Sequence, residues 1–339
     1  MKEMVKYIGK RLLYALLTLF ILSIIVFSIA RILPGDPART VAGPRAPEEA
    51  VEQIRHRLHL DEPLPIQYVI WLKDVLSGDL GYSVLTGRSV TKDVIAFLPI
   101  TMEVILLAAS LEIIGGVLLG VLAGSFPNKP PDYFGRLFAY VGIAIPSFAW
   151  AIILQQMLTW SIPLFPTAGR LSGEMTAPQR VTGFILIDAL IAGSPSVALD
   201  ALRHMILPAL ALAIPPMGQD ARIVRQEMAR NANKDYAALA RSYGLPFGSY
   251  RFKYLLKPSL IPAVTVMGMD VASLLGNAFV VEIVFNYPGF SRYGMQAILN
   301  TDLNGVVALV LVIGIIFAIA NIIVDIVVAS LDPRVRLGQ

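Results

Sequence analysis

The residues of this sequence that could do chemistry are a few acids inside apolar segments. Glu112 and Asp270 each lie midway along a stretch long enough to cross a membrane. A charge at that depth is costly, and it usually faces a bundle interior or water. Such an acid could meet a cationic group of a passing solute. It could also form a buried polar contact with a neighbouring helix or another membrane subunit, and that interpretation is favoured.

The histidines give little support to an enzyme. His56 and His59 are three residues apart in a polar stretch, and without cysteine a surface location is favoured over a zinc site. We expect His204 to be a capping or interfacial residue. Neither a Gly-x-Ser-x-Gly nucleophile motif nor a G-x-x-x-x-G-K-[ST] phosphate loop is present. We therefore predict no catalytic residue, no metal site and no cofactor in this chain, and any ATP hydrolysis must be done by a partner.

The composition is typical of an integral membrane protein. Of the 339 residues, 56% are hydrophobic and 15% are charged, whereas soluble domains carry about 25% charged residues. A membrane-spanning helix needs roughly 20 apolar residues. We predict an all-α fold with six spans, the third broken near Pro146, at about 8–31, 100–126, 136–160, 204–224, 258–285 and 305–329. The apolar stretch 181–192 is too short to span, which indicates a re-entrant or interfacial helix.

The distribution of basic residues predicts the orientation. The loop 219–257 has eight basic and three acidic residues, whereas 32–99 has seven basic and nine acidic residues. Basic loops stay in the cytoplasm, so both termini should be cytoplasmic. The expected parts are the first span at 1–31, an extracytoplasmic loop subdomain at 32–99, a five-span core at 100–330 and a cytoplasmic tail at 331–339.

The basic loop contains a short amphipathic helix, predicted within 235–247. Its apolar residues Tyr236, Leu239, Ala240 and Tyr243 recur at helical spacing. Asp235 stands at the start, where a carboxylate caps free N–H groups. Gly244 suits the left-handed position that ends a helix. Two turns are not stable alone in water, so this helix should lie on anionic lipid or dock on a protein.

Several motifs, in order along the chain, resemble the permease subunits of bacterial and archaeal ABC importers of the dipeptide, oligopeptide and nickel branch. The resemblance runs from end to end. The residues that carry it are Arg31 to Pro37, Leu60 to Tyr68, Gly78 to Ser83, Ala144 to Phe148, Leu202 to Ala209, Asp235 to Pro262, Leu275 to Phe285, Tyr287 to Gly289 and Leu331 to Arg336.

This resemblance implies that helix 235–244 is a coupling helix fitted into a groove on a cytoplasmic ATPase. The residues expected to dock are Asp235, Tyr236, Leu239, Ala240, Arg241, Tyr243, Gly244, Leu245 and Arg251. The implied partners are a homologous second permease, two ABC ATPases that bind ATP and Mg²⁺, an extracytoplasmic binding protein and the lipid membrane, with no nucleic acid. Where the wider importer pattern has Glu-Ala-Ala, this chain has Ala238-Leu-Ala.

The implied function is that of half the translocation pathway of an importer in the bacterial or archaeal inner membrane. Di- and oligopeptides are the expected substrates, with oligosaccharides or a nickel chelate as alternatives. An ATP-independent secondary transporter or channel is the competing class, and a membrane enzyme is a distant third. Residues expected in the pathway or gate are Glu112, Asp270, Gly276, Asn277 and Glu282.

Three further acids have expected roles of their own. Glu103 and Asp302, like Glu282, stand near the outer ends of spans and are expected to contact the gate or a delivery protein. Asp325 lies near the cytoplasmic end of the sixth span and is expected to be an interfacial structural acid. Gly276 and Asn277 suit either the pathway or a close seam with the second permease.

Overall fold

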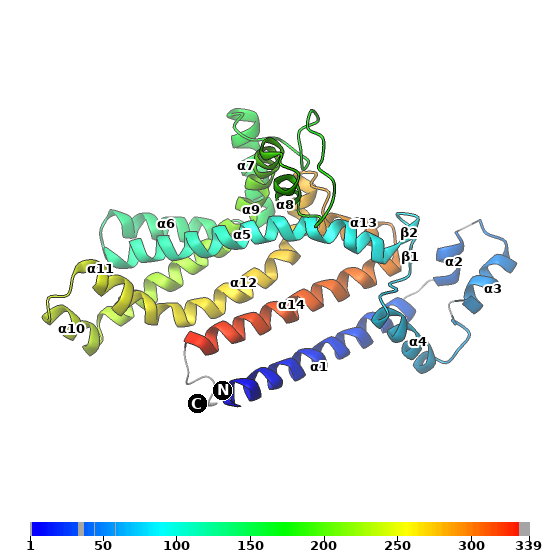
Figure 1. Ribbon diagram of the computed structural model, residues 1–339, viewed down its shortest axis with the longest axis horizontal. Coiled ribbons are helices and arrows are strands. Elements are labelled where there is room, and N and C mark those ends of the chain that lie inside the picture. The colour runs from blue at the N-terminus through cyan, green and yellow to red at the C-terminus, as the bar shows by residue number, and fades with distance from the viewer. Residues whose placement is uncertain (1, 33–36, 44, 58, 332–339) are drawn as a thin grey trace.

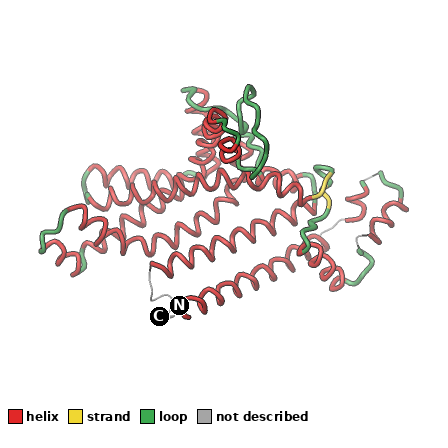
Figure 2. The backbone as a smooth tube through the Cα atoms, viewed as in Figure 1, coloured by secondary structure: helices red, strands yellow, loops and turns green. Residues whose placement is uncertain are grey.

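The computed structural model describes residues 2–331 apart from 33–36, 44 and 58. The described residues form a bundle of long helices that run side by side along the longest axis of the molecule (Figure 1). Figure 2 shows that nearly everything outside the loops is helical. Residues 332–339 of the predicted tail and part of the motif at Arg31 to Pro37 lie outside the described residues.

Five helices are long and apolar enough to span a membrane, and a sixth span is possible as a bent pair. The five are α1 (Lys2–Ile32), α5 (Val90–Ser125), α9 (Pro195–Ala232), α12 (Lys257–Val284) with the short turns before it, and α14 (Leu303–Leu331). The predicted positions are correct. Two helices are longer than the spans predicted for them: α5 begins ten residues before residue 100, and α9 continues to Ala232.

The predicted break in the third span is sharper than a kink. Helix α6 (Pro130–Ala144) ends before Pro146, and α7 (Ser147–Gln155) continues through a π-helical turn, η1 (Gln156–Ser161), at 106° to it. Proline has no N–H to continue the ladder, and its ring excludes the preceding residue from helical geometry. The prolines of α9, by contrast, stand inside a continuous helix.

The outer segments carry more structure than the sequence predicts. Before α5 come α2 (Pro37–Ala42), α3 (Glu48–Arg57), α4 (Leu64–Leu76) and a hairpin of β1 (Tyr82–Ser83) with β2 (Arg88–Ser89). The strands are antiparallel, and Tyr82 faces Ser89. The hairpin follows a tight turn, in which Gly81 N donates to Asp79 Oδ1 at 2.9 Å.

The core lies where α5, α9 and α12 meet. Small residues on α5 allow the close approach: a Cβ atom on Gly116 would lie 2.6 Å from Asp220 Cβ, and one on Gly120 would lie 2.6 Å from Val224 Cβ. Glycine removes the side chain that would hold two helices apart. Helix α1, in contrast, packs mainly on α14, with Arg11 3.1 Å from Asp325.

Several short helices connect the long ones, among them α11 (Phe247–Ser249) and the π-helical η2 (Tyr250–Leu256) before α12. Helix α8 (Ile185–Ile191) falls within the predicted re-entrant or interfacial stretch, and α13 (Phe290–Leu299) connects α12 to α14. The start of α1 and the finish of α14 lie toward the same end of the bundle as α10 (Asp235–Ser242), while α2, α3, α4 and the hairpin lie toward the other (Figure 1).

Candidate functional site

The helix predicted in the basic loop is present as α10. Its first residue is Asp235, and the preceding Lys234 makes no side-chain capping hydrogen bond. Gly244 follows the last turn with φ of +65°, and its N–H donates to Arg241 O at 3.0 Å. The predicted glycine stop is therefore correct, because only glycine adopts this conformation without steric cost.

The two faces of α10 differ in side-chain size. Tyr236, Leu239 and Tyr243 point away from the chain and are 38%, 57% and 76% exposed. Ala237 and Ala240 are buried against the chain itself. The sequence analysis placed Ala240 on the docking edge, but its methyl group is on the inward face, where small side chains let α10 approach the end of α9.

Arg251 of this loop is engaged with other parts of the chain. Arg251 lies 3.2 Å from the ring centre of Phe247 and 4.1 Å from that of Phe126, and it donates to Ser125 O at 3.1 Å. Guanidinium groups over aromatic faces are attracted by the ring quadrupole. Arg251 therefore fastens the loop to the end of α5 and is not a free contact for a partner.

The other charged residues of the loop remain accessible. Arg241 donates to Ala232 O at 3.0 Å, and its side chain is exposed, as is that of Asp235. Leu245 is half-buried beside Gly244. The surface that α10 offers to a partner is thus apolar at its centre, with one acid and one arginine at its edges.

A second surface runs along α12. Its exposed residues recur at helical spacing. Four of them are polar or small, namely Thr265, Ser273, Gly276 and Asn277, and the apolar Met269 and Val280 lie among them. A Cβ atom built on Gly276 would meet nothing within 4 Å. Exposed positions on α1 are instead filled by large apolar residues such as Leu13 and Leu16, as lipid requires. We call the α12 set the polar stripe.

Three acids meet behind the polar stripe. One carboxylate oxygen each from Glu112, Asp220 and Asp270 lie within 4.8 Å of one another. Glu112 and Asp220 are fully buried, and Asp270 is half-buried and accepts a hydrogen bond from Gln219 Nε2 at 3.3 Å. Glu112 and Asp270 were expected from the sequence, but Asp220 was missed. Asp220 gave no local signal, because Arg222 and Arg225 follow it closely at the start of the basic loop 219–257.

Comparison with known proteins identifies the family. Residues 116–337 match the model of the binding-protein-dependent transport system inner membrane component, and residues 4–105 match its N-terminal membrane component. Together the two matches cover almost the whole chain.

The chain belongs to this family of transport permeases.

Similar proteins agree with this assignment. The chain is 36% identical, over 93% of both lengths, to the probable D,D-dipeptide transport system permease protein DdpB of Escherichia coli K12. It is 32% identical to the dipeptide transport system permease protein DppB of Alkalihalophilus pseudofirmus, over 98% of this chain and 100% of that protein. It is 31% identical to the glutathione permease GsiC of Salmonella typhimurium, over 98% and 99%. The family resemblance inferred from sequence motifs is confirmed, and the chain is a multi-pass inner-membrane transport component.

Glu282 and Asp302 are buried and accept hydrogen bonds from other parts of the chain. Glu282 is buried and accepts hydrogen bonds from Thr101 Oγ1 and from Arg292 N, the latter at 2.7 Å. Asp302 is buried and accepts from Ser83 Oγ. In this structure both carboxylates are therefore engaged within the chain, and the roles expected for them at the gate or toward a delivery protein stay predictions.

Glu103 is also buried, and it fixes α8. It accepts hydrogen bonds from Arg170 Nη2 at 2.9 Å and from Leu186 N at 2.7 Å. The start of α8 is further held by Asp188, which accepts from Thr182. Burial raises the pKa of Asp188, but the hydrogen bonds from Thr182 and Gly183 outweigh it and hold that pKa below its usual range.

The histidines have ordinary environments. His204 is buried in α9 with Nδ1 2.8 Å from Asp200 O, so it neither caps a helix nor lies at an interface. His56 lies 3.0 Å from Asp61 on the exposed outer loop. Among the residues that the structure describes, the acid trio is the one group of His, Asp or Glu with metal-ligand spacing.

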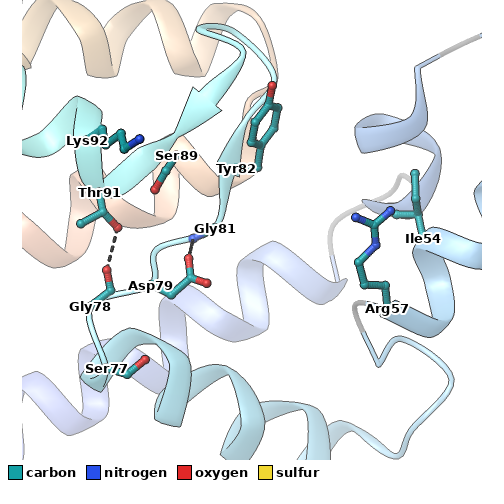
Figure 3. A pocket seen from close by; sticks show the side chains of 10 residues that line it. All are labelled: Ile54, Arg57, Ser77, Gly78, Asp79, Gly81, Tyr82, Ser89, Thr91 and Lys92. Carbon is teal, nitrogen blue, oxygen red and sulfur yellow. Dashed lines mark hydrogen bonds between the residues drawn. The ribbon is translucent and has the colours of Figure 1, made fainter.

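The segments before α5 line an open cavity of about 840 Å³. Figure 3 shows Ile54 and Arg57 of α3 on one side and the turn and hairpin residues on the other, among them Asp79 and Lys92. The hairpin wall is braced, because Thr91 Oγ1 donates to Gly78 O at 2.7 Å. This opening lies at the end of the bundle opposite α10.

Proposed function

We propose that this chain is one of two permease subunits of an ATP-driven importer of di- and oligopeptides. The observation that carries this proposal is the exposed apolar face of α10, made of Tyr236, Leu239 and Tyr243. Large apolar side chains at the tip of a basic loop lose free energy in water unless something covers them. A soluble ATPase would cover them and deliver its conformational change to the bundle.

The arrangement of the loop supports a mechanical role. Arg251 fastens the loop to Ser125 at the end of α5, and Asn231 Nδ2 donates to Ser259 Oγ at 2.9 Å between α9 and the start of α12. A displacement of α10 would therefore move α5, α9 and α12 together. ATP binding would draw two such loops toward each other, and hydrolysis would release them.

The polar stripe of α12 is the proposed wall of the pathway. A second permease would face it, so that Ser273 and Asn277 line the route between the two subunits. The outer cavity with Arg57 and Lys92 is the proposed contact for a substrate-binding protein. This places α10 and both termini in the cytoplasm, in agreement with the basic residues of loop 219–257.

Relatives support the substrate class. DdpB and DppB are named for dipeptide transport and GsiC for glutathione transport, and glutathione is itself a peptide. We therefore take small peptides as the substrate of this permease.

The test is transport by the Gly244→Arg variant in the assembled importer. A side chain at φ of +65° is strained, and the arginine projects beside the apolar face of α10, where no atom of the chain lies within 4 Å of the new Cβ. We expect normal amounts in the membrane and loss of peptide uptake. The matched control is Gly173→Arg, a glycine of ordinary φ with equally free surroundings. Uptake by Gly244→Arg at the wild-type rate would refute the docking role.

A further inference from the structure

The acid trio has a geometry that goes beyond a polar contact between helices. The three carboxylate oxygens lie within 4.8 Å of one another. For any such three points there is a central position whose distance from each is at most 4.8 Å divided by √3, or 2.8 Å. Oxygen ligands lie 2.3–2.6 Å from Ca²⁺ and about 2.1 Å from Mg²⁺. A small relaxation of three side chains would bring the oxygens of Glu112, Asp220 and Asp270 to such distances from a single ion.

The charge of the trio has no counterpart in the described part of the chain. No lysine or arginine there forms an ion pair with any of the three, and the one recorded donor is Gln219 to Asp270. Three carboxylates so close together cannot all remain charged in an apolar interior without a neutralising partner.

An independent observation is the state of the buried oxygens. All four side-chain oxygens of Glu112 and Asp220 are buried without a hydrogen-bond partner, although buried polar atoms are nearly always paired. Protonation of one acid would remove one charge and supply a single O–H donor, which can serve only one of these four oxygens. A metal ion supplies positive charge and bonds to several oxygens at once.

The packing around Asp220 favours a bare ion over an organic cation. Glu112 and Asp220 have no exposed surface, and the close approach of Gly116 to Asp220 leaves no room for a substituted ammonium group between α5 and α9. Access remains from the side of Asp270, which is half-buried beside the polar stripe. Water entering there would complete the coordination shell.

We propose that Glu112, Asp220 and Asp270 bind a hard divalent metal ion between α5, α9 and α12. An all-oxygen ligand set of carboxylates selects Mg²⁺, Ca²⁺ or Mn²⁺ over softer metals. The ion would join α5 and α9 to α12, the helix that carries the polar stripe. Its occupancy would therefore set how tightly α12 is held against the other two helices.

The experiment is Mn²⁺ binding to the purified, nucleotide-free importer complex, followed by electron paramagnetic resonance. We expect one tightly bound Mn²⁺ per copy of this chain, displaced by excess Ca²⁺ or Mg²⁺. Glu112→Gln and Asp220→Asn each remove a ligand and should weaken binding by at least about tenfold. Asp325→Asn, an acid inside a span but paired with Arg11, is the matched control and should bind as wild type does.

Folding is checked separately. A variant is included only if it elutes as an intact importer complex in size-exclusion chromatography. If Glu112→Gln or Asp220→Asn fails to assemble, Asp270→Asn, at the half-buried position, takes its place. Wild-type protein that retains no Mn²⁺ would overturn the proposal, as would equal binding by the qualified trio variants. Because binding is measured without transport, failure here is distinguishable from failure of the proposed importer function.

Discussion

Replacing Gly120 by alanine should push α5 away from α9. The new Cβ would lie 2.6 Å from Val224 Cβ and 2.9 Å from Ala221 O. Ordinary contact begins at 3.4 Å, so the nearest pair must separate by 3.4 minus 2.6, or 0.8 Å. Neither Val224 Cβ nor a backbone oxygen can rotate aside, so the helices themselves must move. Overpacking of this kind costs about 1–3 kcal/mol.

Alanine is also more favourable than glycine inside a helix by about 1 kcal/mol. A matched glycine-to-alanine variant elsewhere gains the same amount, so this contribution cancels when the two variants are compared. Gly9→Ala on α1 makes the same change in a helix where the added Cβ meets nothing within 4 Å. The difference between the two variants then isolates the packing cost. We expect the midpoint of thermal unfolding in detergent to be lower for Gly120→Ala by roughly 1–4 °C. Equal midpoints would refute the close packing of α5 on α9.

Three further predictions test other parts of the account. The chain has no cysteine, so a membrane-impermeant thiol reagent should label Leu76→Cys in intact cells but Tyr243→Cys only in inside-out vesicles; the reverse pattern would invert the proposed orientation. Arg251→Ala should leave the permease folded but reduce ATP-driven uptake several-fold, because the loop loses its stack on Phe247 and its bond to Ser125; uptake equal to wild type would show that this link carries no motion. Glu103→Gln should lower the unfolding midpoint by the equivalent of about 3 kcal/mol, because Arg170, whose side chain is only 19% exposed, loses its charged partner; an unchanged midpoint would show that the pair contributes no net stability.

Local patterns in the sequence account for much of this fold. Runs of apolar residues correctly predicted where the spans lie, Pro146 marked the break in the third span, and Gly244 marked the end of α10. Each of these depends on properties of a few neighbouring residues: apolar length, a missing N–H or freedom at positive φ. The 106° angle at the break depends on what α7 packs against, so a local pattern cannot give it.

The face of α10 shows why periodicity alone is insufficient. Ala240 shares the helical spacing of Leu239 and Tyr243, and hydropathy alone groups it with them. The structure separates them by size, because the methyl groups of Ala237 and Ala240 fit against the chain while the larger side chains project outward. In a protein with a partner, the largest apolar residues of a short helix can belong to the interface and the smallest to its own core.

Asp220 was missed for a different reason. It stands near Arg222 and Arg225, so its sequence context resembles the polar start of a cytoplasmic loop. Helix α9 continues past it to Ala232, and the close approach to Gly116 places its carboxylate beside Glu112. That proximity joins residues far apart in sequence and depends on the register between helices.

The most direct test of the central claim is a cross-link from α10 to the ATPase. Leu239→Cys adds a single thiol to a chain that has none, at the centre of the exposed face. A short heterobifunctional reagent on that thiol should cross-link this chain to the co-purified ATPase, and the yield should change when ATP is added. The same cysteine placed at Leu76 on the opposite end should give no such product. Efficient uptake by an importer in which Leu239→Cys never cross-links to an ATPase would contradict the account.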